Sequence, residues 1–284
     1  MIVIESAGLS DIGKKRKENQ DYLFLDSGMG LYVVADGMGG HRAGEVASRL
    51  VVETIRDYFS QFHQDGGNAE LIYKNASLSK EANRLLSSIQ LSNKVVHQAS
   101  LDNTSQRGMG STVSAVYFTD DTIIAANVGD SPIYLIRSGK IQLLSVLHTV
   151  LAEQAAIDPK KAERLGREFR HVLTRAMGTD IAVKADICEI QCYKDDILVI
   201  SSDGLSDKAT PEEILSVVNS KQPDQACQHL VKLANERGGD DNVTTIVLKV
   251  AMVEYKRNKI KRFFSSMLNR LTNKHLREPS EIKI

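Results

Sequence analysis

The chain has little of what would build a disulfide framework, a membrane span or a secretion signal. Its 284 residues include three cysteines and no tryptophan. Cys188, Cys192 and Cys227 cannot form a disulfide network, so we expect buried thiols in a reducing compartment. No run reaches the roughly 18 apolar residues of a membrane-spanning helix. The N-terminus lacks the basic and apolar regions of a signal peptide, and together these absences predict a cytoplasmic protein.

The chain also lacks an excess of charge of either sign. Its 36 basic and 36 acidic residues balance, which removes any general attraction to nucleic acid or to acidic partners. The charge is nevertheless unevenly distributed. Residues 251–284 carry nine Lys and Arg against three Asp and Glu, a balance of +6, so residues 1–250 carry −6. We interpret the change as a boundary between a large domain, 1–250, and a basic tail, 251–284.

The basic tail has the pattern of an amphipathic helix, because apolar residues recur at helical spacing among basic ones. The apolar members are Ile260, Phe263, Phe264, Met267, Leu268 and Leu271. Three interpretations are open: the tail packs on its own domain, docks to a partner protein, or lies on an anionic membrane surface. The last would bring a cytoplasmic protein to a membrane.

Hydrophobic periodicity predicts strands before and after two pairs of helices. Short runs rich in branched residues predict strands at 2–10, 22–25, 31–35, 111–118, 122–128, 133–136, 141–144, near 173, and at 182–192, 197–202 and 243–250. Helices are expected at 44–62, at 77–100, from Thr210 onward, and at 224–236. Residues 151–170 are polar and helix-prone, which predicts a mobile flap or an inserted helix. This order favours an α+β fold, with antiparallel sheets flanked by helices, over alternating βαβ units.

Four aspartates stand where predicted strands end or begin. Asp36, Asp130 and Asp203 each follow a predicted strand, and Asp241 precedes the last one. Carboxylates at strand ends can converge at one rim of a sheet, where they repel and cannot all stay ionised without compensation. Divalent cations supply that compensation, and oxygen ligands favour Mg²⁺ or Mn²⁺. A single Asp-Gly pair is typical of a turn, so the signal lies in the ordered set.

The ordered motifs resemble those of a known enzyme family. In sequence order they are Arg16-Lys17-Glu18-Asn19-Gln20-Asp21, Val34-Ala35-Asp36-Gly37-Met38-Gly39-Gly40-His41, Gly110-Ser111-Thr112, Gly129-Asp130-Ser131, Ser202-Asp203-Gly204 and Asp241-Asn242-Val243-Thr244. Over about residues 4–250 the chain thus resembles the bacterial metal-dependent serine/threonine protein phosphatases of type 2C. The resemblance implies a four-layer αββα fold, a central antiparallel β-sandwich flanked by helices on both sides, with a metal site at one end.

The resemblance also implies a metal centre. Asp36 would bridge two metal ions, and the carbonyl of Gly37 would complete one of them. Asp203 and Asp241 would hold the first metal, and Asp130, with Asp203, would hold a weaker third ion found in bacterial relatives. The expected cofactors are therefore Mn²⁺ or Mg²⁺, two per active site with room for a third. Two such cations can clamp an in-line displacement and lower the pKa of bound water, which an inert phosphomonoester requires.

Three further residues are implied in catalysis. Asp21 would act through metal-bound water, and Arg16 would grip two phosphate oxygens with its planar fork. His41 is open between two roles: an acid or proton relay for the leaving oxygen, and a structural residue near the metals. We expect structural roles for His148 and His171.

Two positions depart from the family pattern. Pro132 stands where relatives usually have the arginine of Gly-Asp-Ser-Arg, and Leu147 stands where they usually have an aspartate before the residue equivalent to His148. Neither is an expected metal ligand, so metal binding should survive. The changes leave the docking of the flap and the choice of substrate open. Asn242 is expected either to orient a ligand or water, or to shape a turn.

The leading interpretation is a phosphatase that removes phosphate from phosphoserine and phosphothreonine in proteins, as a monomer that opposes a serine/threonine kinase. A catalytically silent binding module with the same fold is the alternative. Loss of a metal ligand would favour that module, yet every expected ligand is present. A phosphatase dedicated to one regulatory switch is a further alternative, but the sequence shows no sensor domain. No cysteine lies in a phosphate-cradling loop, which argues against cysteine-dependent phosphatases.

Overall fold

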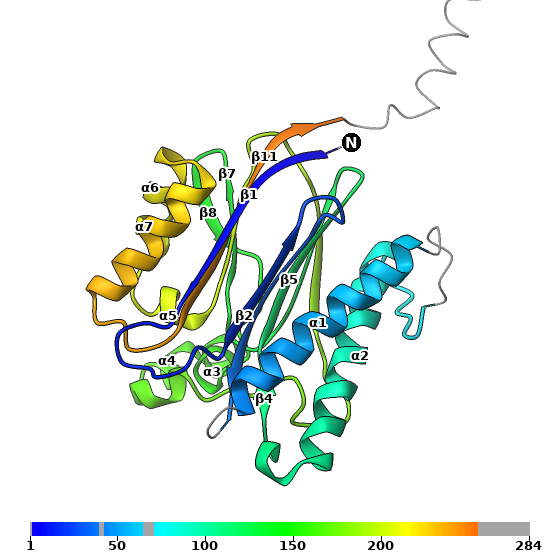
Figure 1. The fold of residues 1–284 in the computed structure, drawn as a ribbon. Coiled ribbons are helices and arrows are strands. Elements are labelled where there is room, and N and C mark those ends of the chain that lie inside the picture. Colours follow the sequence, from blue (N-terminus) through cyan, green and yellow to red (C-terminus); the bar gives the residue numbers. More distant parts are fainter. Residues whose placement is uncertain (1, 40–42, 65–70, 255–284) are drawn as a thin grey trace, which may run out of the picture.

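The computed structural model describes the chain except residues 1, 40–42, 65–70 and 255–284. The described residues form a β-sandwich with helices on both outer sides (Figure 1). His41 and the amphipathic helix expected in the tail lie outside the described residues, so both stay predictions.

Two antiparallel sheets build the sandwich within the described residues. The first has five strands, in the order β1 (Ile2–Asp11), β11 (Val243–Val253), β10 (Ile197–Ser201), β7 (Ile133–Arg137) and β8 (Lys140–Leu143). The second has six, in the order β2 (Asp21–Asp26), β3 (Leu31–Met38), β5 (Val113–Thr119), β6 (Thr122–Val128) and β9 (Asp186–Gln191), with β4 (Gly110–Ser111) paired to β3. The predicted antiparallel sandwich is therefore confirmed.

A helical layer covers the outer face of each sheet. The second sheet packs against α1 (Ala43–Gln64) and α2 (Lys80–Asp102), and the first against α6 (Pro211–Ser220) and α7 (Pro223–Glu236) (Figure 1). Helix α6 begins as predicted, because Thr210 and Glu213 form a reciprocal capping box. There are also two short helical elements: η1 (Thr104–Gln106) follows α2, and α5 (Asp203–Ser206) follows β10. The four layers have the expected αββα order.

Strand β3 shows why the predicted strands are continuous apolar runs. Leu31 and Val33 face α1 and α2, while Tyr32 and Val34 face the opposite sheet. All four are 0% exposed, because the sheet is covered on both sides. Burial of apolar surface is the main favourable contribution to folding. The sandwich interior thus holds the strand ends in fixed positions at one end of the molecule.

The segment between β8 and β9 is helical rather than extended. It contains α3 (Val150–Ile157), α4 (Pro159–Ala162) and η2 (Arg167–Arg170), so an inserted helical segment is confirmed. The prediction of a strand near 173 was wrong, because Leu173 makes only an isolated bridge to Thr149 within the described chain. The strand predicted at 182–192 is also shorter, and begins at Asp186. The bridge is a single residue pair, so the residues around Leu173 have no neighbouring strand among the described residues with which to form a ladder.

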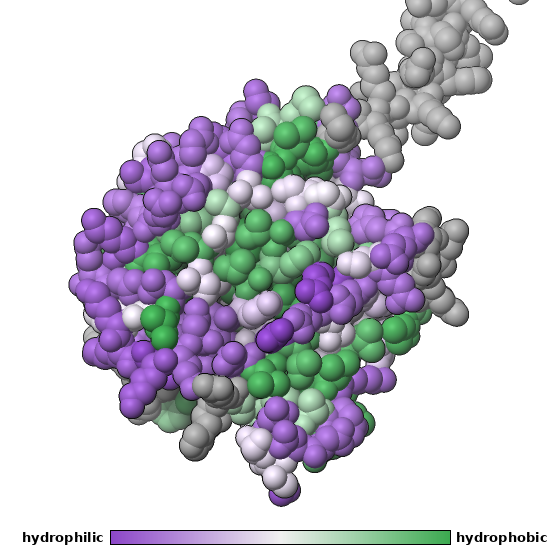
Figure 2. All heavy atoms as spheres, in the orientation of Figure 1, coloured by the Kyte–Doolittle hydropathy of each residue, from purple (hydrophilic) through white to green (hydrophobic). Residues whose placement is uncertain are grey.

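The face of the molecule drawn in Figure 2 is hydrophilic over much of its area. Figure 2 shows hydrophilic residues over the outer side of α6 and α7, with hydrophobic residues reaching the surface mainly in a central band between these helices and α1. Among the residues that the structure describes, no helix has both the length and the apolar character needed to cross a bilayer.

Leu135 tests the contribution of the sandwich interior to stability. Its side chain is 0% exposed on β7, between the sheets, whereas Leu143 on neighbouring β8 is 44% exposed. We expect Leu135→Ala to lower the free energy of unfolding by about 3 kcal/mol, because it leaves a cavity that the rigid sheets cannot fill. Leu143→Ala should change it by less than about 0.5 kcal/mol. Urea titration of both variants measures the difference; equal losses would contradict this view of the core.

Candidate active site

The predicted site residues converge at one end of the sandwich. Asp21 of β2 lies opposite Asp36 of β3, Asp130 follows β6, Asp203 begins α5 after β10, and Asp241 precedes β11. β3 does not end at Asp36, as the sequence suggested, but continues to Met38 because Gly37 and Met38 pair with β4. A cleft of about 560 Å³ opens there. It is lined by six of the predicted residues: Arg16, Asp36, Gly37, Asp130, Asp203 and Asp241.

Asp36 is the centre of the negative charge. Burial raises its pKa well above the ordinary value, and repulsion from Asp21, Asp203, Asp130 and Asp241 raises it further. The other four carboxyl groups therefore act on this one position. Asp21 is 6% exposed and lies outside the lining of the cleft. Burial raises its pKa to about 7, with repulsion from the other aspartates adding to the effect.

Two glycines allow the backbone to approach closely beside these carboxylates. A Cβ on Gly37 would lie 2.0 Å from the carbonyl oxygen of Gly44 at the start of α1. A Cβ on Gly204 would lie 2.0 Å from the carbonyl oxygen of Asn242. Real Cβ atoms do not come so close, so the chain beside Asp36 and Asp203 requires glycine for space.

Hydroxyl side chains from the ordered motifs hold the strand that carries Asp36. The Asp36 amide donates to Thr112 Oγ1 at 3.0 Å, and Ser111 Oγ donates to the Asp36 carbonyl at 3.0 Å. Thr112 Oγ1 also lies 2.8 Å from Ser131 Oγ, beside Asp130. The Gly110-Ser111-Thr112 motif therefore joins the backbone of Asp36 to the loop that carries Asp130.

His148 positions the loop that carries Asp130. Its Nδ1 accepts from the Gly129 amide at 3.0 Å, so its Nε2 proton can donate to Asp186 Oδ2, 2.8 Å away. Burial lowers the pKa of His148, in keeping with a neutral ring, although Asp186 opposes the shift. Arg175 donates to the same Asp186 oxygen at 2.6 Å. The structural role predicted for His148 is confirmed by these contacts.

The side chain of Asn242 holds the loop before β2 through hydrogen bonds to its backbone. Its Oδ1 accepts from the Gln20 amide at 2.8 Å, while its Nδ2 donates to the carbonyls of Ile12 and Glu18 at 2.9 and 3.0 Å. These bonds use the side-chain amide on backbone groups, which favours the structural role over ligand orientation. Arg16, carried by this loop, donates to Asp241 Oδ2 at 2.7 Å and has a half-exposed side chain at the cleft.

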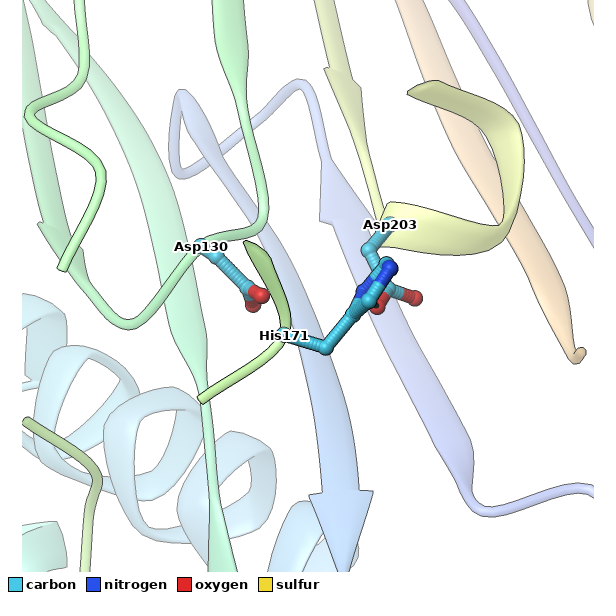
Figure 3. A group of neighbouring side chains, drawn as sticks. All are labelled: Asp130, His171 and Asp203. Carbon is cyan, nitrogen blue, oxygen red and sulfur yellow. Dashed lines mark ion pairs between the residues drawn. The ribbon is translucent and has the colours of Figure 1, made fainter. Parts of the chain in front are cut away.

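His171 is a site residue that sequence reasoning missed. Figure 3 shows its ring, which follows η2, against the Asp203 carboxylate, with Asp130 projecting from the loop after β6. One ligand atom from each of Asp130, His171 and Asp203 lies within 4.8 Å of the others. Its Nδ1 is 3.6 Å from Asp203 Oδ2 and its Nε2 is 3.5 Å from Asp207 Oδ2. A lone histidine in a polar segment carries no motif, so tertiary folding alone brings it here.

The aspartate cluster fits hard divalent cations. Asp21 Oδ1 and Asp203 Oδ1 are buried and lack a hydrogen-bond partner among the described residues. A buried carboxylate oxygen without a partner is costly, and a cation would satisfy it. Burial and the neighbouring Asp203 also raise the pKa of Asp130 to about 7. Oxygen donors of this kind suit Mg²⁺ and Mn²⁺, while the imidazole of His171 adds a donor that suits transition metals.

Comparison with known proteins agrees with this geometry. The sequence model of the protein phosphatase 2C family matches residues 10–247. The chain belongs to the protein phosphatase 2C family. Protein phosphatase PhpP of Streptococcus pneumoniae is 30% identical over 254 residues, which cover 87% of this chain and 98% of PhpP.

Solved structures of other serine/threonine phosphatases share the fold of this protein phosphatase 2C member. The Streptococcus agalactiae enzyme is 33% identical, with a TM-score of 0.72 over 89% of this chain and 100% of that one. The catalytic domain of PstP, a Mycobacterium tuberculosis enzyme solved in complex with two manganese ions, is 27% identical, with a TM-score of 0.75 and the same coverage. The matches support the phosphatase interpretation and not the silent binding module.

The raised pKa values predict that the metal-free phosphatase is more stable in mild acid than at neutral pH. Asp21 and Asp130 have a folded-state pKa of about 7 against an ordinary 3.8. The folded protein therefore binds these protons more tightly than the unfolded chain. The free energy of unfolding should fall as pH rises from about 4 through about 7. Urea titrations of chelator-treated protein at pH 5 and pH 8 measure this trend. Greater stability at pH 8 would contradict it, and Asp130→Asn should reduce the difference.

The position of His171 predicts a contribution to metal affinity. We expect His171→Asn to weaken the weakest Mn²⁺ site about tenfold or more, since even residues that merely orient ligands contribute this much. Calorimetric titration with Mn²⁺, together with the electron paramagnetic resonance signal of free Mn²⁺, measures each binding event without substrate. His229→Asn, on an exposed position of α7, is the matched control. Identical titrations for both variants would exclude His171 as a metal ligand.

Proposed function

We propose that the chain hydrolyses phosphoserine and phosphothreonine in proteins, at two Mn²⁺ or Mg²⁺ ions held by the aspartate cluster. The observation that carries the proposal is the convergence of five carboxyl groups on the cleft end of a protein phosphatase 2C fold. Relatives named serine/threonine phosphatases support the substrate class, and the two manganese ions of PstP support the cofactor.

The roles of the individual ligands follow the resemblance. Asp36 would be shared between the two ions, and the Gly37 carbonyl would contribute to one of them. Asp203 and Asp241 would hold the first ion, and Asp130, with Asp203, would hold an accessory third. When bound, paired divalent cations lower the pKa of water between them and offset charge on the phosphoryl oxygens. The convergence on Asp36 and the unpartnered oxygen of Asp203 support these assignments.

Two further residues of the chain act beside the proposed metal centre. Arg16 grips the substrate phosphate at the cleft, where its guanidinium remains charged because the hydrogen bond that it donates to Asp241 raises its pKa. Asp21 would act through metal-bound water, for which its buried and unpartnered Oδ1 is available as an acceptor. His41 keeps both predicted roles, acid or proton relay and structural residue.

The finer assignments also remain proposals. We infer a monomer that works in the cytoplasm and reverses a serine/threonine kinase. The absence of a disulfide among Cys188, Cys192 and Cys227 fits a reducing compartment. The catalytic domain spans about residues 1–250. The basic tail, 251–284, packs on that domain, docks to a partner or lies on a membrane surface. No described contact favours the dedicated regulatory switch.

Asp36→Asn tests the proposed function. We expect wild-type protein with Mn²⁺ to hydrolyse p-nitrophenyl phosphate and a phosphothreonine peptide, and chelator to abolish both activities. Asp36→Asn should lower kcat about a hundredfold or more, since it removes the bridging charge. Asp57→Asn, on the exposed side of α1, should retain wild-type activity. Equal rates for wild type and Asp36→Asn would overturn the metal mechanism.

A further inference from the structure

A second cavity lies beside the catalytic cleft. It has a volume of about 370 Å³, within the range of small-ligand sites. Asp130, His171 and Asp203 line both the cavity and the cleft. The two spaces therefore meet at the proposed metal ligands, and a chain with its phosphate in the cleft passes next to the cavity.

The walls of this cavity are mostly apolar and come from separate parts of the chain. They include Pro132, Tyr134, Leu147, Leu151, Ala152 and Ala155. Pro132 and Tyr134 are buried at the start of β7, whereas Leu147 and Leu151 are half-buried, so their side chains present apolar surface to the opening. An apolar wall beside a charged centre is suited to an apolar group that enters together with a phosphate.

Leu147 is held in place by the backbone on either side of it. The Val146 amide donates to Asn127 Oδ1 at 3.1 Å, and the His148 amide donates to the Gly129 carbonyl at 3.0 Å. Helix α3, which carries Leu151, is capped by Thr149 Oγ1. The apolar walls are therefore fixed before a ligand arrives, which reduces the entropic cost of binding.

The two departures from the family pattern both lie in this cavity. Pro132 and Leu147, the two positions singled out in the sequence as departures, both line the cavity and make two of its walls apolar. Charge remains at the rim, where Arg170 is exposed and Asp207 lies near His171. An acidic group entering the cavity would be repelled by Asp207, whereas an apolar side chain would displace water from Leu147 and Leu151.

We propose that this cavity binds an apolar side chain of the phosphoprotein substrate, close in sequence to the phosphorylated residue. Continuity with the catalytic cleft makes the substrate chain its occupant. The inference rests on the proposed function, since it names the substrate class of the same site. Pro132 and Leu147 are then specificity-determining residues, and the enzyme prefers leucine or phenylalanine over alanine or glutamate at one position beside the phosphothreonine.

A peptide series measures the preference. Phosphothreonine peptides with an alanine background carry a single leucine at each flanking position in turn, and the full chain with Mn²⁺ is assayed for kcat/KM. We expect about a tenfold gain or more from leucine at one position, the size of effect that a hydrophobic pocket provides. A glutamate at that position should lower kcat/KM below the alanine value.

Two variants locate the preference in the cavity. Leu147→Asp and Leu151→Asp come from different elements, and each should reduce the leucine-to-alanine ratio of kcat/KM to about one. Leu143→Asp makes the same chemical change on an exposed residue outside the cavity, and should keep the wild-type ratio. A ratio compares two peptides on the same preparation, so partial loss of folded protein does not affect it. Equal reductions in all three variants would indicate a general charge effect and overturn the proposal.

The outcomes separate the inference from the proposed function. If no peptide is hydrolysed in the presence of Mn²⁺, the proposed function fails. If all peptides are hydrolysed equally well by the wild type, the function stands and the subsite does not exist. In that case the cavity accommodates something other than substrate.

Discussion

Mutual repulsion among the carboxylates clustered at the cleft is the constraint on which this structure depends. Asp36 is raised in pKa by its burial and by four other aspartates, and such a group is unstable unless protons or cations compensate it. The surrounding fold holds the carboxylates close together despite their repulsion. Ser111 donates a hydrogen bond to the Asp36 carbonyl, Thr112 accepts one from the Asp36 amide, and Ser202 donates one to the Asp21 carboxylate. These bonds fix the Asp36 backbone and the Asp21 side chain. The arrangement therefore stores negative charge that divalent cations can neutralise.

The sandwich makes this arrangement rigid. Both sheets are buried on both faces, so their strand ends cannot shift without disturbing a packed interior. Each carboxylate comes from a different stretch of chain, and both hydroxyl side chains and close backbone contacts join these stretches. Gly37 and Gly204 allow those backbones to touch, and Asn242 ties the loop of Arg16 to the same end. Rigid placement of charge is what metal-assisted phosphate chemistry requires of a protein.

The segment between β8 and β9 supplies a histidine and cavity walls that do not come from the sandwich strands. It contributes His171 beside Asp203, and its helix α3 walls the apolar cavity that adjoins the cleft. Under the proposed function, the chemistry and the choice of substrate come from different structural parts. The aspartates lie in or beside the ends of the strands, which packing holds fixed, whereas Leu147 and the α3 residues of the cavity wall belong to the segment between β8 and β9. Changes at Pro132 and Leu147 would alter the cavity and leave the proposed metal ligands in place.

The sequence by itself determined most of the strands, the helices that cover the sheets and the ordered set of aspartates, because hydrophobic period and capping are local and the motifs are contiguous. Tertiary structure decided what depends on residues far apart in the chain. It buried Asp21 opposite Asp36, carried β3 past Asp36 through pairing with β4, and used Asn242 to hold a loop. It also left Leu173, where a strand was expected, with a single bridge to Thr149. Such outcomes depend on which partners reach a residue across the fold, and no local pattern records them.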